Sequence, residues 1–136
     1  MATKPPTVVD LVWTERLTFA ATLSKTDMVI DSSGVEGPSP VELLGAALAG
    51  CMAIDVGHIL TRGRHPFTSL RTKLVAERAA DEPHRFLAVT LHFDIGGLVP
   101  TDAIERAIQL SRDKYCSVWH SLRQDIALKV TFDVTP

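Results

Sequence analysis

Two cysteines are the residues of this sequence best suited to covalent or redox chemistry. Cys51 lies inside a long apolar segment, and Cys116 follows a short polar one. A buried free cysteine usually serves as a small apolar residue, and position alone favours this role for Cys51. Cys116 precedes a segment expected to start a helix, where free N–H groups stabilise a thiolate, and Arg112 and Lys114 lie nearby in the sequence. Taken singly, Cys116 is the better candidate for a reactive thiol.

The same cysteines can also be combined with neighbouring side chains into a set of metal ligands. Cys51, Asp55 and His58 fall at positions i, i+4 and i+7, which share one face of a helix, and Cys116 and His120 fall at i and i+4. Two cysteines and two histidines could form a tetrahedral zinc site. The spacings differ from those of zinc fingers and zinc ribbons, so zinc is the less favoured interpretation and no metal ligand is assigned.

Composition limits the classes of partner and the location. With 136 residues we expect one domain spanning 1–136. Fourteen basic and sixteen acidic residues give a net charge of −2, so nucleic acid is not an expected partner. The longest apolar run, 43–54, is shorter than the roughly 20 residues of a membrane span, which argues against a membrane partner. The N-terminus lacks the apolar core of a signal peptide, so we expect a cytoplasmic protein with reduced thiols. No glycine-rich phosphate loop is present, and no cofactor is expected.

A long helix must position Cys51. Ser39 can cap its N-terminus, Pro40 suits the first helical position, and Glu42 completes a capping box. The helix should run to about Arg62, with Gly63 as a left-handed stop. Its nearly uniform apolar character predicts a buried central helix. Three internal glycines (Gly45, Gly50 and Gly57) predict a close approach of other backbone, from this chain or a partner subunit.

Strands and short helices surround this central element. A second helix should open at Thr101 or Asp102, with Asp102 and Glu105 as a capping pair, and Ser117 should cap a short helix that positions Cys116. The connector of residues 81–84 predicts an antiparallel hairpin. The order predicts an α+β fold with a largely antiparallel sheet. The expected strands are 17–22, a return strand from 28, 70–79, 86–95 and 126–134.

Two sequence motifs resemble one known family. The segment SPVELLGAALAGCMAIDVGHIL, residues 39–60, resembles the central helix of the OsmC/Ohr family, in which a cysteine follows the helix-start proline by eleven positions, here Pro40 and Cys51. The segment KYCSVWHSL, residues 114–122, resembles the family's second cysteine motif. With the predicted element order, the resemblance covers about residues 11–134. Asp55-Val56 and YCSVW are more similar to the YhfA-type branch than to Ohr itself.

The resemblance implies an intertwined homodimer with two central helices buried between sheets. It also implies a thiol-dependent peroxidase that reduces organic hydroperoxides in oxidative-stress defence. Cys51 would then be the peroxidatic cysteine and Cys116 the resolving one, with a dithiol as reductant, which reverses the ranking that position alone gives. Whether the two thiols lie close enough for a disulfide is open at this point.

One position departs from the family pattern. In the peroxidase branches a glutamate directly after the helix-start proline holds an arginine that pairs with the catalytic thiolate, and that position here is Val41. Glu42 points about 100° away and already has a capping role. Arg16, the only arginine of the N-terminal β region, is the candidate for the arginine role, or else an exposed strand residue. The alternative function is therefore an OsmC-fold protein that binds a small apolar or thiol-bearing ligand without catalysis.

Overall fold

The computed structural model describes residues 4–136 and divides the chain into two compact units. One unit ends at Leu44, and the other comprises Gly45–Pro136. The expectation of a single domain stays a prediction. Each unit carries its own three-stranded sheet, so the α+β class is confirmed.

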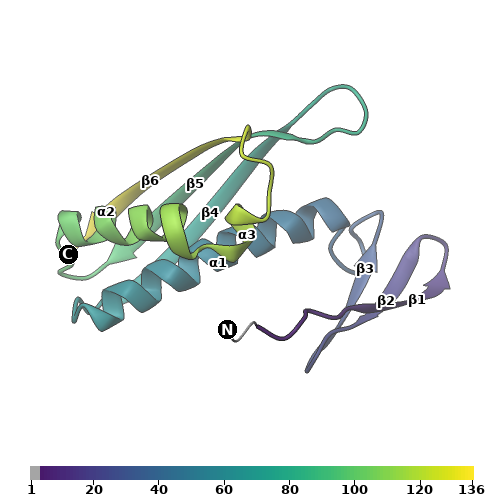
Figure 1. Ribbon diagram of the computed structural model, residues 1–136, viewed down its shortest axis with the longest axis horizontal. Helices are drawn as coiled ribbons and strands as arrows, with labels where there is room; N and C mark the ends of the chain where they lie inside the picture. Colours follow the sequence, from purple (N-terminus) through teal and green to yellow (C-terminus); the bar gives the residue numbers. More distant parts are fainter. Residues whose placement is uncertain (1–3) are drawn as a thin grey trace. The chain divides into compact units, whose positions relative to one another are not determined.

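The N-terminal unit is an antiparallel meander in the order β1-β2-β3 (Figure 1). Its strands are β1 (Asp10–Glu15), β2 (Thr18–Thr22) and β3 (Asp27–Asp31). The strand expected from residue 17 begins one residue later, because the chain turns at Arg16, whose φ is 48°. The turn is closed by the indole N–H of Trp13, which donates to the Arg16 carbonyl at 2.8 Å.

A buried carboxylate fixes the loop that leads from this sheet to the long helix. Asp31 accepts hydrogen bonds from the backbone N–H of Glu36 at 3.0 Å and from the Ser33 hydroxyl at 2.9 Å. The Ser33 N–H and the Thr18 hydroxyl donate to it as well. Led by the Glu36 N–H, these donors lower the pKa of Asp31 from 3.8 to about 2. The loop is therefore held by an ionised side chain.

The long helix α1 (Pro40–Arg62) begins as the sequence predicts. The Ser39 N–H donates to Glu42 Oε1 at 3.1 Å, and the Glu42 N–H donates to Ser39 Oγ at 3.2 Å, which completes the capping box. The helix ends at Arg62, as predicted. The left-handed residue is not Gly63, which still donates to the Ile59 carbonyl, but Arg64, whose φ is 60°.

Only one face of α1 is buried within a single chain. Its buried residues are Gly45, Leu48, Met52, Val56 and Leu60, whereas the side chain of Ile54 on another face is 72% exposed. The expectation of burial on all sides is thus not met inside one chain. By length and composition α1 could cross a membrane, since its best 18-residue window has a mean hydropathy of 1.8, so apolar run length alone did not exclude a span. Its packed face is the arrangement of a core helix.

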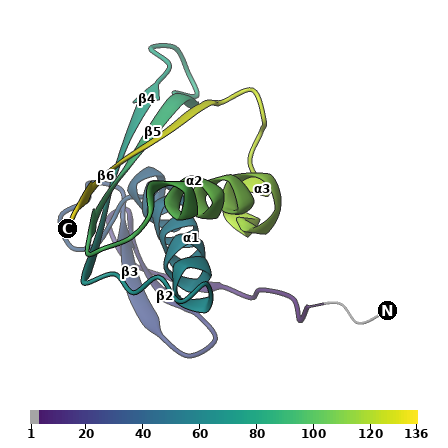
Figure 2. The same ribbon diagram turned by 90° about the vertical axis from the view of Figure 1, so that its left-hand side faces the viewer.

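The C-terminal unit builds a second sheet against that buried face. Its strands are β4 (Ser69–Arg78), β5 (Phe86–Gly96) and β6 (Ala127–Thr135), in the order β4-β5-β6. β4 and β5 form the predicted antiparallel hairpin, and β6 adds in parallel to β5. Helices α1 and α2 (Thr101–Leu110) lie on the same side of this sheet (Figure 2). The core between them contains Leu48, Met52, Leu91, Phe93, Ile95 and Ile104.

The helix glycines meet side chains and not backbone. A Cβ at Gly45 would lie 3.4 Å from Leu74, and one at Gly57 would lie 3.6 Å from Leu70, both on β4. A Cβ at Gly50 would meet nothing within 4 Å. Within the described chain the predicted close approach of backbone is therefore wrong, and an approach from a partner subunit stays a prediction.

Candidate active site

Cys51, Asp55 and Cys116 converge in the C-terminal unit. One ligand atom of each, the two Sγ atoms and a carboxylate oxygen, all lie within 4.8 Å of one another. Cys51 and Asp55 are one helical turn apart on α1, and both are half-buried, whereas Cys116 is fully buried. Both thiols are free. Residues 65 positions apart in the sequence are therefore brought into one cluster.

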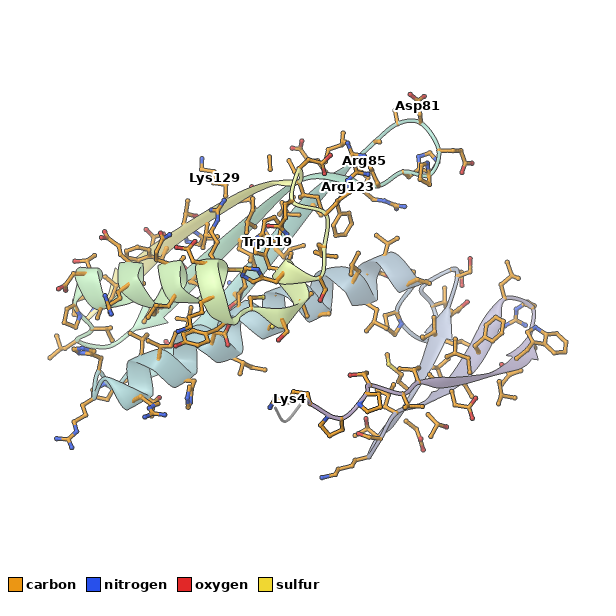
Figure 3. All side chains as sticks on the ribbon, viewed as in Figure 1. Lys4, Asp81, Arg85, Trp119, Arg123 and Lys129 are labelled. Atoms are coloured by element: carbon orange, nitrogen blue, oxygen red, sulfur yellow. The ribbon has the colours of Figure 1, made fainter. Side chains whose placement is uncertain are left out.

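A change in helix geometry positions Cys116. Directly after α2, residues Ser111–Tyr115 form a π-helical turn, and the Cys116 N–H donates to the Ser111 carbonyl at 2.8 Å. Cys116 then caps the short helix α3 (Ser117–His120), because its Sγ accepts a hydrogen bond from the Trp119 N–H at 3.3 Å. The prediction that Ser117 would be the cap is wrong. Figure 3 labels Trp119 of α3, whose side chain is buried.

The environment of Cys116 disfavours its thiolate. Burial raises the pKa of the Cys116 thiol to about 11 and outweighs the Trp119 N–H, which lowers it. The hydrogen bond and charge of Cys51 and the charge of Asp55 raise this pKa further. The raised pKa counts against the thiolate that position alone predicts at Cys116. The ammonium of Lys114, expected to help, lies over the Tyr115 ring.

A buried hydroxyl orients Asp55. Ser111 is fully buried, and its Oγ donates to Asp55 Oδ2 at 2.8 Å. Sequence reasoning missed this contact because Ser111 continues the apolar spacing of the preceding helix. A polar residue on an apolar helix face was the available signal.

The predicted Asp102–Glu105 cap of α2 is also wrong, since its N-cap is Pro100 and no side chain caps it.

The histidines proposed as zinc ligands lie outside the cluster. His58 and His120 are exposed, and the cluster in the described chain consists of the two cysteines and Asp55. A second three-ligand cluster comprises His92, Asp94 and Asp133 on strands β5 and β6 of the second sheet. The set of two cysteines and two histidines suggested by helical spacing is therefore not assembled.

Arg16 belongs to the N-terminal unit, and its role toward Cys51 stays a prediction. Its side chain is 68% exposed, and its guanidinium lies 3.3 Å from Glu15 and 4.0 Å from Glu36. Sequence reasoning considered position 41 and the adjacent Glu42 as the acidic partner and missed Glu36. The loop that Asp31 holds carries Glu36, so it supplies Arg16 with a second acidic neighbour beside Glu15.

A separate hollow lies between the end of α1 and the start of α2. Its volume is about 340 Å³, and Ile59, His65, Asp102 and Arg106 are among the residues that line it. Neither cysteine lines it, so the thiol cluster and this hollow are distinct features of the C-terminal unit.

Comparison with known proteins decides the family. The model of the family described as OsmC-like protein matches residues 31–131. The chain belongs to the OsmC family. It is 36% identical over 125 residues to protein YhfA of Escherichia coli strain K12, which covers 90% of this chain and 93% of that protein. The resemblance to the YhfA-type branch is thereby confirmed.

Solved structures give the same fold for this OsmC-family chain. A hypothetical protein of Aquifex aeolicus matches with a TM-score of 0.90 and 26% identity over 97% of this chain and 98% of that one. A Legionella pneumophila protein described as an organic hydroperoxide resistance protein OsmC matches with a TM-score of 0.71 and 18% identity, covering 98% of this chain and all (100%) of that one. The OsmC-like fold is thus shown, and the second likeness concerns the fold alone.

Proposed function

We propose that this OsmC-family chain is a thiol-dependent peroxidase that reduces organic hydroperoxides. The observation that carries the proposal is the pairing of Cys51 with Cys116, whose Sγ atoms lie within 4.8 Å. Membership of the family and the likeness to hydroperoxide resistance proteins support a redox role. The cellular setting would be oxidative-stress defence in the cytoplasm.

The different burial of the two thiols supports a division of roles. Cys51 is half-buried and open to a small peroxide, so it is assigned as the peroxidatic residue. Cys116 is fully buried, and its raised pKa of about 11 keeps it protonated near neutral pH. A protonated, sheltered thiol is suited to wait for the sulfenic acid and to supply the proton that leaves with water.

The proposed steps balance in atoms and electrons. The Cys51 thiolate attacks the distal peroxide oxygen, the O–O bond breaks, and the products are Cys51 sulfenic acid and an alcohol once the alkoxide takes a proton. The Cys116 sulfur then attacks the sulfenic sulfur, which forms the disulfide and releases water. An external dithiol restores both thiols by exchange.

Arg16 is proposed to favour the Cys51 thiolate, with Glu36 in the place of the family's missing glutamate. An arginine beside a thiol lowers its pKa and stabilises the attacking form. Glu36 lies 4.0 Å from the Arg16 guanidinium and belongs to the loop that Asp31 fixes. On this proposal Val41 cannot hold the arginine as the family's glutamate does, and Glu36 holds it instead.

Apolar exposure supports the homodimer that the resemblance implies. In a single chain Val12 and Trp13 of β1 are each 61% exposed, and Ile54 of α1 is 72% exposed. Exposed apolar groups of this size favour association over solvation. We propose that a second copy of the chain covers them, and native mass spectrometry of the reduced protein measures this directly.

A thiol count under peroxide challenge tests the proposed chemistry. Fully reduced protein receives one equivalent of cumene hydroperoxide, and free thiols and intact mass are followed over seconds to minutes. We expect both thiols to disappear together with a loss of two hydrogens in mass. Cys116→Ser should consume one equivalent and stop as the Cys51 sulfenic acid, which dimedone would trap.

The same measurement separates the alternative function. If both thiols survive the challenge, the peroxidase proposal fails. A small molecule that is retained in native mass spectrometry would then support an OsmC-fold binding protein, the function that the valine at position 41 suggests.

A further inference from the structure

The cluster of Cys51, Asp55 and Cys116 has a property that peroxide chemistry does not use. Three electron-rich ligand atoms meet within 4.8 Å, and each belongs to a side chain that binds metals as an anion. Within residues 45–136 no lysine, arginine or histidine side chain forms an ion pair with Asp55. The cluster therefore concentrates potential negative charge without a cation inside its own unit.

The surroundings of the three ligands are organised to hold them in place. Ser111, itself fully buried, donates to Asp55 Oδ2 at 2.8 Å. The Trp119 N–H donates to Cys116 Sγ at 3.3 Å. Hydrogen bonds of this kind to ligand atoms fix their direction and are the usual support of a metal site. Cys51 and Asp55 are fixed relative to each other by one turn of α1.

We propose that the reduced protein binds one Zn²⁺ through Cys51 Sγ, Cys116 Sγ and the Asp55 carboxylate. Two thiol ligands select a soft or borderline cation over Mg²⁺ or Ca²⁺. Binding replaces two S–H bonds by two Zn–S bonds and releases two protons to solvent. A tetrahedral site with Zn–S bonds of about 2.3 Å needs sulfur atoms about 3.8 Å apart, so a movement of at most about 1 Å brings the two sulfurs to that separation. Three protein ligands leave the fourth position for water.

Zinc and the disulfide exclude each other at this site. Oxidation of the two cysteines to a disulfide removes both thiolate ligands and must release the metal. Where the proposed peroxidase activity operates, on which this consequence rests, zinc would compete with peroxide for Cys51 and hold the reduced pair. The metal proposal itself needs no turnover.

The test is metal binding to the intact reduced protein without oxygen. Reduced protein is titrated with Co²⁺, whose thiolate charge-transfer absorption reports sulfur ligation, and Zn²⁺ then displaces it. We expect one metal per chain and a weakening of about 100-fold or more in Cys51→Ser. Asp55→Asn should weaken binding about 10-fold or more, and oxidation by diamide should abolish it until a reductant is added.

The second three-ligand cluster supplies the matched control. His92→Ala removes a ligand from the surface cluster and should leave the stoichiometry and the cobalt spectrum unchanged. If Cys51→Ser binds as tightly as the parent, or if His92→Ala loses the metal, the assignment is overturned. Circular dichroism and thermal melting show that each variant is folded, and Asp55→Asn, which keeps both thiols, tests the site separately from sulfur chemistry. Peroxide consumption is measured in a separate assay, so the zinc proposal and the peroxidase proposal can fail independently of each other.

Discussion

Two clusters in the C-terminal unit bring potential metal ligands equally close together and differ in what surrounds them. In each, three potential ligand atoms lie within 4.8 Å of one another. Cys51, Asp55 and Cys116 stand on helix α1 and at the end of a π-helical turn, and a buried Ser111 and a backbone N–H hold them. His92, Asp94 and Asp133 stand on the open face of the second sheet, where their side chains are 32%, 52% and 76% exposed.

The two clusters therefore differ in their support and not in the proximity of their ligand atoms. Asp94 and Asp133 are paired across parallel strands, and His92 Nε2 lies 3.3 Å and 3.1 Å from their carboxylates. Water and salt screen these groups, so little energy is gained by their meeting. In the other cluster Cys116 is fully buried, and this burial raises the pKa of its thiol, with Cys51 and Asp55 raising it further.

The largest contrast is expected in peroxide turnover. Cys51→Ser removes the attacking sulfur and should lower turnover of cumene hydroperoxide by about 1000-fold or more. His92→Ala should retain the parent rate, because the surface cluster takes no part. A coupled assay with a dithiol reductant measures both. Equal rates for Cys51→Ser and the parent would remove Cys51 from the mechanism.

A smaller contrast concerns the hydroxyl behind each cluster. Ser111 donates to Asp55, and Thr131 Oγ1 lies 2.6 Å from His92 Nδ1. Ser111→Ala should lower the affinity for Zn²⁺ about 10-fold, the usual cost of losing a group that orients a ligand. Thr131→Ala should leave it unchanged. Competition with a chromophoric chelator measures both affinities, and a loss in Thr131→Ala would transfer the metal to the sheet surface.

A third contrast is in the pH dependence of stability. The pKa of Cys116 is raised from 9.0 to about 11 in the folded protein, so its neutral form is the one that folding favours. The stability it contributes is complete below pH 9 and is lost as the pH rises toward 11. Thermal midpoints of the reduced protein should therefore fall more steeply in this window for the parent than for Cys116→Ala. His92→Ala should keep the parent's slope, and equal slopes for Cys116→Ala and the parent would contradict the buried environment.

Sequence alone located most of the elements around the site. The capping box at Ser39 and Glu42 is local, since residues three apart along the chain make it, and it was predicted correctly. The pairing of β4 with β5 was predictable because apolar and polar residues alternate in β5 and a short connector joins the two strands. The family motifs around Cys51 and Cys116 predicted the fold that the structural neighbours share.

The parts that failed depend on distant contacts. The cap of α3 is Cys116 and not Ser117, because the π-helical turn shifts the start of that helix and no pattern in the sequence announces it. The stabilised thiolate expected at Cys116 is not favoured, because burial, which comes from tertiary packing, outweighs the N-terminus of a four-residue helix. The hydrogen bond from Ser111 to Asp55 joins residues 56 positions apart, and helical spacing within one segment cannot predict such a contact.

The smallest effect is expected for the stability of the surface cluster itself. His92→Ala removes one cross-strand contact with Thr131 and the two contacts with Asp94 and Asp133. Exposed pairs of this kind contribute a few tenths of a kcal/mol each and are screened by salt, so the three contacts together should be worth about 1 kcal/mol and the thermal midpoint should fall by about 4 °C at low salt. The decrease should shrink as salt is added, because water then replaces the ion pairs at little cost. A large decrease that persists at high salt would mean that this cluster, too, is held by its surroundings, and the contrast with Cys51, Asp55 and Cys116 would lose its physical basis.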